Sequence, residues 1–394
     1  MRLARGVLGE VGHGVALKGI AMVSRLGFLL GVAPNLVSGE LSEYVYLGTI
    51  ALLLGRVLSF GVDEQLPLAV GGNRERAGPW SRLSERILVV QIFALVVCFL
   101  MPSDVLIVWL LTLCYVNLGL MGGQLRTVRI TGAERLRDLH WVLFLAGSLA
   151  LSASNASTLL MIMAASLVLV QLLEAVVSRI GRLSLEGNGL PRLGDYTTLL
   201  SLSWKKLVAG AILILILRAV VVWPRGLGLS INLDALAYAL LIGEAFWQTA
   251  MVLVHRRYAR YCALPESGRG PSILGDLPRT SMLIGGYTLV AALAVLGLAF
   301  GDVSIAGFAD WVDTAQVVVF FGIVTAFLLI RYALWVIVDF SWNLTLLEAL
   351  TVVGQVIAIA TLPMMYWPSV QIALVSVLLF FAWRLCKNAL QNVH

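Results

Sequence analysis

The sequence has 394 residues, of which 60% are hydrophobic and only 13% charged, and its mean hydropathy is +0.93. Soluble domains are about 45–50% apolar and need charged side chains to cover their surface, so this composition excludes a soluble enzyme. The formal charge of +6 does not predict a nucleic-acid partner, because the basic residues lie mostly between hydrophobic stretches, where membrane orientation explains them.

Continuous apolar runs along the chain have about the length that a helix needs to cross ~30 Å of hydrocarbon. We place them at 15–33, 44–61, 86–102, 104–123, 139–154, 157–178, 206–223, 235–254, 281–300, 314–338, 344–363 and 368–386. The first run follows a basic segment at 1–5 and is expected to be retained as a helix. The runs do not alternate, which excludes a strand barrel. The sequence therefore predicts an all-α polytopic protein with about 12 transmembrane helices.

Lysine and arginine are retained on the cytoplasmic side of a membrane. In this sequence they are concentrated in every second loop between the predicted spans. If the amino terminus is inside, the cytoplasmic loops hold Arg74, Arg76, Arg82, Arg86, Arg126, Arg129, Arg135, Arg137, Arg179, Arg182, Arg192, Lys205, Lys206, Arg256, Arg257, Arg260, Arg269 and Arg279. The opposite loops hold only Arg225. We therefore expect a multi-pass protein of the bacterial cytoplasmic (inner) membrane with both termini in the cytoplasm.

The most polar internal stretch, residues 179–206, divides the spans six and six. Transporters are often built from two such repeats with the substrate bound between them. The predicted organisation is an N-terminal lobe at 1–180, a cytoplasmic linker at 181–205 and a C-terminal lobe at 206–394. The two six-helix lobes are expected to surround a central cavity.

Charged residues inside the spans carry most of the functional signal, because each costs at least ~2.5–3.5 kcal/mol at the bilayer centre and must face protein or water. The five basic ones, which we take as candidate substrate-binding residues, are Lys18, Arg25, Arg56, Arg218 and Arg331. Lys18 and Arg25 are two helical turns apart and share one face. With Arg56 on the next helix they would form a cationic site for a phosphate or carboxylate.

A second interpretation of the same basic residues remains open. Lys18 and Arg56 can snorkel to the cytoplasmic interface, and Arg25 can be paired internally with an acid. For Lys18 the sequence does not decide between the two, whereas the mid-span position of Arg25 favours a cavity.

Acids in the spans are candidates for coupling transport to an ion. Glu174 and Glu244 lie within predicted spans, and Glu244 forms a polar stripe with Gln248 one turn later. Such an acid can carry a proton, but a salt bridge between Glu244 and Arg218 is an equally good interpretation. Glu348, near the turn after the tenth span, is expected at an interface, where it is solvated or hydrogen-bonded.

No catalytic or metal-binding pattern emerges from the residues that usually supply one. The histidines do not form HExxH, the Gly-rich stretches at 71–73 and 119–123 lack GxxxxGK[ST], and the four cysteines contain no CxxC pair. We therefore expect no enzyme, no metal and no cofactor.

The stretch from Leu17 to Gly72 reads LKGIAMVSRLGFLLGVAPNLVSGELSEYVYLGTIALLLGRVLSFGVDEQLPLAVGG. It resembles the amino-terminal signature of bacterial polysaccharide and O-antigen flippases, members of the multidrug/oligosaccharidyl-lipid/polysaccharide exporter superfamily. The shared features are a basic residue entering the first helix, an arginine before a Gly-rich end, Glu43-Tyr44 in a short outer loop, and a second helix ending at Phe60-Gly61. The chain departs from the signature at Val45, where a glycine is usual.

The resemblance implies a V-shaped bundle that moves a polyprenyl-diphosphate-linked oligosaccharide to the outer leaflet by alternating access. Basic residues on the first two helices of related flippases face the central cavity, and Lys18, Arg25 and Arg56 occupy comparable places. The implied partners are the lipid-linked oligosaccharide, membrane lipids, and the polysaccharide polymerase and export machinery.

Two other functions remain as alternatives. An ion-coupled exporter of small drugs from the same superfamily would depend more on acids such as Glu244. A membrane-embedded glycosyl or acyl transferase would need a paired acid or histidine at one interface, and the sequence offers none that we can identify.

Overall fold

The computed structural model describes residues 2–59, 74–127, 135–178, 190–229, 231–264, 266–300 and 311–391. Within these ranges the chain is helical and contains no strand. Eleven of the described helices are long and apolar enough to cross a membrane. The prediction of an all-α polytopic membrane protein is confirmed.

The chain divides into two compact units, residues 1–211 and 212–394. Unit 1 contains α1 (Arg2–Gly31), η1 (Ala33–Asn35), α2 (Glu40–Leu58), α4 (Arg74–Leu100), α5 (Asp104–Thr127), η2 (Arg135–Leu139), α7 (His140–Ala150), α8 (Ala156–Ser178) and the beginning of α10 (Leu193–Gly226). Unit 2 contains the rest of α10, α11 (Asp234–Ala263), α12 (Glu266–Phe300), α13 (Trp311–Val338), α14 (Trp342–Thr361), η3 (Met364–Tyr366) and α15 (Trp367–Gln391).

Helix α10 is longer than the sequence predicts. Residues 193–205, expected in the cytoplasmic linker, are its first turns, and the division between the two units falls inside it after Ala211. Its membrane-spanning part begins at Ser203, so the helix continues well beyond the apolar run that identified it. Residues 181–189 of the expected linker lie outside the described part of the chain.

The expected span at 139–154 is built from two elements. Helix α7 has only 11 residues, but the five-residue 3₁₀ helix η2 leads directly into it. A 3₁₀ helix rises about 2.0 Å per residue and an α-helix 1.5 Å, so together they extend about 26 Å. This length is close to the thickness of the hydrocarbon core, but the segment is not among the eleven helices that are long and apolar enough to cross a membrane, so the predicted span at 139–154 stays a prediction.

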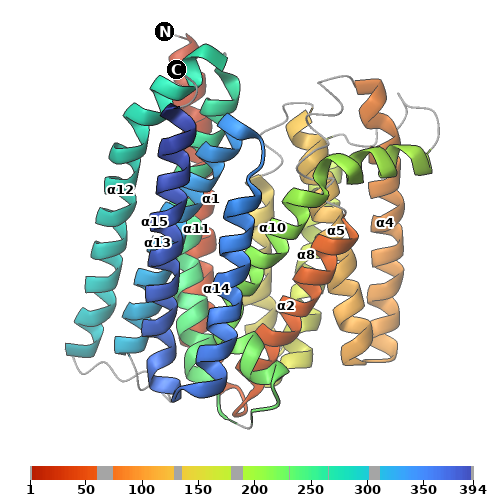
Figure 1. Ribbon diagram of the computed structural model, residues 1–394. Helices are drawn as coiled ribbons and strands as arrows, with labels where there is room; N and C mark the ends of the chain where they lie inside the picture. The colour runs from red at the N-terminus through yellow and green to blue at the C-terminus, as the bar shows by residue number, and fades with distance from the viewer. Residues whose placement is uncertain are drawn as a thin grey trace. The chain divides into compact units, whose positions relative to one another are not determined.

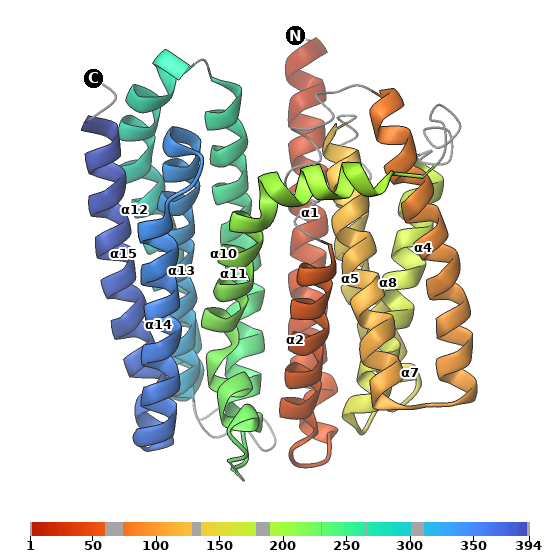
Figure 2. The ribbon, with the colours of Figure 1, turned by 45° about the vertical axis from the view of Figure 1, so that its right-hand side comes forward.

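Unit 1 is organised around α5, which packs against α2, α4 and α8, while α7 packs against α1 and α8 (Figure 2). The α2–α5 contact needs a glycine, because a Cβ at Gly55 would lie 2.6 Å from the Cβ of Tyr115. Close approach of this kind lets helices associate in lipid, where the hydrophobic effect does not drive them together. The core of unit 1 therefore holds its helices at short range.

In unit 2 the central helix is α13, which packs against α11, α12 and α15 (Figure 1). Of its membrane-spanning segment, 72% is buried inside the protein. Gly243 and Gly322 permit the close packing, since a Cβ on either would lie less than 3 Å from a side chain of the neighbouring helix. Helix α13 thus has the position of a fully enclosed core helix.

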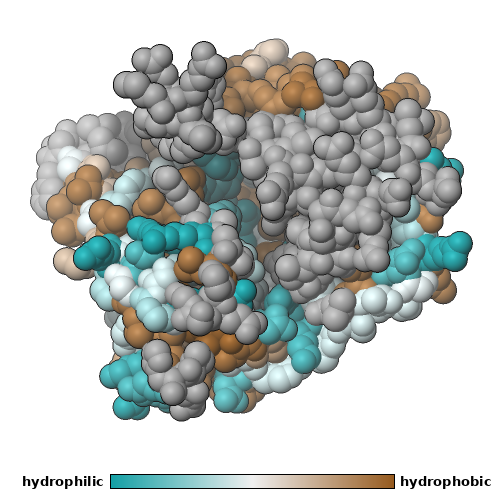
Figure 3. All heavy atoms as spheres, turned by 90° about the horizontal axis from the view of Figure 1, so that it is seen from above, coloured by the Kyte–Doolittle hydropathy of each residue, from teal (hydrophilic) through white to brown (hydrophobic). Residues whose placement is uncertain are grey.

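The outward faces of the helices suit a lipid environment. Large apolar side chains such as Phe93, Leu289 and Val353 are more than half exposed, which is stable only where the surrounding medium is hydrocarbon. Seen along the helix axes, hydrophilic residues lie among hydrophobic ones at one end of the helices (Figure 3). Three cysteines, Cys98, Cys114 and Cys386, are free thiols buried in the protein, as expected for small core residues.

Candidate functional site

The first predicted cation, Lys18 on α1, contacts an acid on a distant part of the sequence. Its Nζ donates to Oδ1 of Asp138 on η2 at 2.8 Å. The lysine side chain is 37% exposed and the aspartate 12%. A pair with this much access to solvent is weak, so Lys18 can exchange its partner for another anion.

Two helical turns further along α1, Arg25 is buried against an aromatic ring. Its guanidinium carbon lies 3.7 Å from the ring centroid of Trp141 on α7, and only 7% of the residue is exposed. A cation over an indole face away from water gains about 2 kcal/mol or more. Trp141 is itself fixed edge-on against Phe144, with ring centroids 5.6 Å apart, so Arg25 has a defined position.

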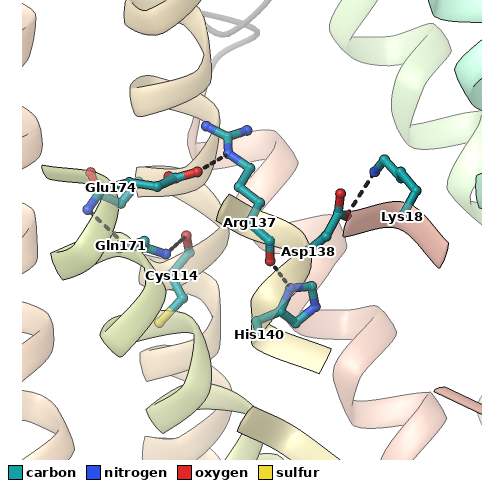
Figure 4. A network of polar contacts seen from close by, with 8 residues as sticks. Lys18, Cys114, Arg137, Asp138, His140, Gln171 and Glu174 are labelled. Atoms are coloured by element: carbon teal, nitrogen blue, oxygen red, sulfur yellow. Dashed lines mark hydrogen bonds and ion pairs between the residues drawn. The ribbon is translucent and has the colours of Figure 1, made fainter. Parts of the chain in front are cut away.

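Arg137 and Asp138 are consecutive on η2, and their side chains point in different directions (Figure 4). Asp138 turns toward Lys18, whereas Arg137 Nε donates to Oε1 of Glu174 on α8 at 3.1 Å. Glu174 is fully buried, and the Arg137 side chain is 22% exposed. The Nη2 atom of Arg137 is buried and donates to no acceptor among the described residues. Such a donor costs about 1–3 kcal/mol, which a bound anion would recover.

His140, the first residue of α7, marks where these basic side chains gather. The positive charges of Arg25, Lys18 and Arg137 all act on its ring, and its Nδ1 lies 2.5 Å from the carbonyl oxygen of Arg137. We call Lys18, Arg25, Arg137, Asp138, His140 and Trp141 the α1–η2 cluster.

A chain of buried amides continues from Glu174 into the centre of unit 1. Gln171, one turn before Glu174, donates to the carbonyl oxygen of Cys114 at 3.0 Å (Figure 4) and accepts from Asn117 at 2.9 Å. Asn117 accepts in turn from Ser84 at 2.5 Å. All three polar side chains are at most 2% exposed. Because each finds a partner, this network holds α4, α5 and α8 together.

Arg56 of α2 is half-buried and lies against α10 within unit 1. A Cβ at Gly210 would stand 2.9 Å from Arg56 Nε and 3.0 Å from Nη2. The missing side chain at 210 therefore makes room for the guanidinium. The predicted place of Arg56 in the same site as Lys18 and Arg25 stays a prediction.

In unit 2 the two predicted cations each contact a carboxylate. Arg218 on α10 donates through Nε and Nη2 to the two oxygens of Glu244 on α11, at 2.6 and 3.0 Å. This is the salt bridge that the sequence left open as the second interpretation of Glu244. Charge-assisted bonds with two parallel contacts are strong and directional, so the pair fixes α10 against α11.

Arg331 on α13 and Glu348 on α14 form the most deeply buried pair in the described part of unit 2. Nε lies 2.9 Å from Oε1, the side chains are 2% and 0% exposed, and the guanidinium also stacks 4.4 Å from the centroid of Trp335. Of the two expectations for Glu348, solvated or hydrogen-bonded, the first was wrong and the second is confirmed, because the carboxylate is fully buried and accepts a hydrogen bond from Arg331. Helices α13 and α14 are joined by a short turn, and Arg331 and Glu348 lie at similar distances along the chain on either side of it. The two side chains therefore meet, and Glu348 is buried.

The structure therefore brings together Lys18 and Arg25, as their spacing predicts, and joins Arg218 to Glu244. It also adds four residues to the first site that sequence reasoning had left without a role, namely Arg137, Asp138, His140 and Trp141. A usable signal was present, because the expected span at 139–154 is short and charged residues lie directly before it. The described residues contain no group of three or more histidines, cysteines or acids that could hold a metal.

Comparison with known proteins gives one informative likeness. No protein-family model matches the sequence, and no curated protein matches it. Among solved structures, the chain is similar to the lipid II flippase MurJ in an inward closed conformation, with a TM-score of 0.50 and 8% identity over 96% of this chain and 90% of that one. The two chains share a fold. A MATE protein in complex with Br-NRF aligns over 97% of this chain and 94% of that one, with 13% identity and a TM-score of 0.43.

Proposed function

We propose that the chain is a flippase that translocates a polyprenyl-diphosphate-linked oligosaccharide across the bacterial cytoplasmic membrane by alternating access, for surface polysaccharide biosynthesis. The supporting observation is the α1–η2 cluster, where Lys18 and Arg25 of the membrane-spanning α1 contact Asp138 and Trp141, next to Arg137. A fold shared with a lipid II flippase agrees with this proposal.

The chemistry of the cluster suits an anionic headgroup in transit. Lys18 and Arg137 contact Asp138 and Glu174, and an anionic headgroup would compete with these two carboxylates for the same donors. Lys18 and Arg137 keep partial access to solvent, and Arg137 has an unused buried donor. A diphosphate leaving bulk water needs such donors, and guanidinium groups bind its oxygens in pairs.

Glu174 is the candidate coupling residue with the most direct link to this site. It is fully buried and holds Arg137 through Nε, so it competes with any anion for the same guanidinium. Protonation of Glu174 would release Arg137 to the headgroup, and its ionisation would favour release of the headgroup. Glu244 is instead engaged by both donors of Arg218, which favours a stabilising role for that carboxylate.

The proposal is tested with the purified full chain in proteoliposomes that carry a fluorescent polyprenyl-diphosphate disaccharide. The fraction of probe that becomes accessible to a membrane-impermeant reagent measures translocation, and empty liposomes give the background. Time-dependent translocation above background is the expected result.

The same liposomes, loaded with a fluorescent cationic drug, distinguish a flippase from an exporter of small drugs. Drug movement without translocation of the diphosphate probe would replace the flippase by an exporter. Transfer of the disaccharide from the probe to an acceptor, detected as formation of polyprenyl diphosphate, would instead indicate a glycosyl transferase.

A further inference from the structure

A groove on unit 1 lies apart from the α1–η2 cluster and is lined almost entirely by apolar side chains. It lies among the ends of α4 and α5 and the lengths of α7 and α8, and its volume is about 600 Å³. Its walls include Phe99, Ile107, Leu143, Ala146, Met161 and Leu169. The volume lies within the range of about 300–1,000 Å³ that is common for small-molecule sites.

The surroundings of the groove restrict its occupant to hydrocarbon. Phe99, Leu143 and Leu169 are 61%, 39% and 53% exposed. Phe99 and Leu169 belong to helices that are long and apolar enough to cross the membrane, and Leu143 lies on the apolar helix α7 between them. Water entering such a groove would find almost no polar partner. The groove opens toward lipid, so a lipid chain is what reaches it.

One end of the groove is polar, and two carboxylates lie just beyond its lining. Ser157 and Thr158, at the beginning of α8, line this end, and the Ser157 hydroxyl donates to Oδ1 of Asp104. Close by, the Ala156 amide donates to Oε2 of Glu40 at 2.6 Å. Two carboxylates therefore meet at the amino-terminal end of α8, where the helix dipole stabilises them.

Basic residues are missing from the segments that form the groove. The chain contains no lysine or arginine from Ile87 to Leu125 or from Asp138 to Ser178. An anionic headgroup at this end would meet Asp104 and Glu40 without a compensating cation. A headgroup with an ammonium group would instead be attracted to them. This distinguishes the groove from the α1–η2 cluster, whose charge is of the opposite sign.

We propose that the groove binds one acyl chain of a zwitterionic, ammonium-bearing phospholipid, with the ammonium group beside Asp104 and the chain between α7 and α8. The site is separate from that of the translocated lipid. A bound chain fills the space beside α7, whose 11 residues make it the shortest helix in the described part of unit 1 apart from the 3₁₀ turns.

The test uses the full chain in vesicles of phosphatidylethanolamine and phosphatidylglycerol that contain a small fraction of phosphatidylethanolamine with a photoreactive group at the end of one acyl chain. Irradiation followed by peptide mapping locates the labelled residues. The expected result is labelling concentrated on the facing walls of α7 and α8. Labelling spread evenly over all lipid-facing helices would overturn the proposal, and this readout needs no variant.

Two variants examine the chain and the headgroup separately. Ala146→Phe places a ring in the groove, and we expect about a tenfold loss of labelling on α8, equivalent to about 1.4 kcal/mol. The matched control Ala294→Phe adds the same ring at an exposed alanine of α12 and should leave labelling on α8 unchanged. Asp104→Asn should remove the preference for photoreactive phosphatidylethanolamine over phosphatidylglycerol while acyl labelling of the groove persists.

Other occupants give different outcomes in the same experiment. Preferential labelling by a photoreactive polyprenyl diphosphate would assign the groove to the anionic lipid and overturn the proposal. Labelling that disappears at high protein-to-lipid ratio would show that a second copy of the chain covers the groove, and would overturn it equally.

Discussion

In unit 1, Lys18, Arg25 and Arg137 gather around His140 with part of their surface open, whereas in unit 2 Arg331 is enclosed with a single carboxylate of its own. Lys18 and Arg137 each contact an acid in the first region, but both of these basic side chains remain partly exposed. A cation that is partly exposed can accept a ligand, whereas an ion pair that is enclosed on all sides stabilises the helices that it joins. The proposed function therefore assigns ligand binding to the partly exposed cations of unit 1 and a stabilising role to the enclosed pair of unit 2.

The largest expected effect is on stability, through the buried pair of unit 2. Arg331→Met leaves Glu348 as an unpaired buried charge, which should lower the free energy of unfolding by about 3–5 kcal/mol. Thermal unfolding of the purified protein in detergent measures the change. Because the double variant Arg331→Met/Glu348→Leu removes both charges, it should recover most of the loss. A single variant as stable as the wild type would contradict a structural role for this pair.

The next effect is on translocation, through Arg25. Arg25→Gln removes a positive charge from the cluster while keeping an amide donor, and a hydrogen bond to a charged group is worth about 1.5–3 kcal/mol. Translocation of the diphosphate probe should fall by roughly 10-fold to 100-fold. Arg384→Gln is the matched control, since Arg384 also lies over an aromatic ring, Phe380, but is exposed. Equal losses in the two variants would indicate a general effect of charge.

A smaller effect is expected at Lys18, where stability and transport should separate. The Lys18–Asp138 pair is open to solvent, so Lys18→Ala should change the free energy of unfolding by no more than about 1 kcal/mol. Translocation should nevertheless fall several-fold, because one cation of the cluster is lost. The two quantities are measured on the same preparation. Unchanged translocation would show that Lys18 does not bind the headgroup and would favour the interpretation in which its side chain snorkels to the cytoplasmic interface.

The smallest effect tests whether Arg56 acts through its position beside α10. A Cβ at Gly210 would contact Nε and Nη2 of Arg56, so Gly210→Ala should displace the guanidinium and reduce translocation a few-fold. In an Arg56→Ala background the same change should have no further effect, since contacting residues are not additive. Additive losses in the double variant would show that Gly210 and Arg56 act independently.

Hydropathy and charge were sufficient to predict the helical fold, because a helix in lipid must be apolar over a fixed length. The shared face of Lys18 and Arg25 followed from helical spacing alone. Their partners could not be predicted, since Asp138 lies 120 residues from Lys18. The segment that contains Asp138 was assigned to a cytoplasmic loop because of its arginines. The Arg331–Glu348 pair could have been found, because the two residues lie at similar distances on either side of one turn.

The affinity of the purified chain for a soluble short-chain prenyl diphosphate tests the central claim most directly. Titration calorimetry should show salt-sensitive binding to the wild type and to Arg384→Gln, and its loss in the triple variant Lys18→Gln/Arg25→Gln/Arg137→Gln. Undiminished binding by a folded triple variant would show that the α1–η2 cluster does not hold the diphosphate.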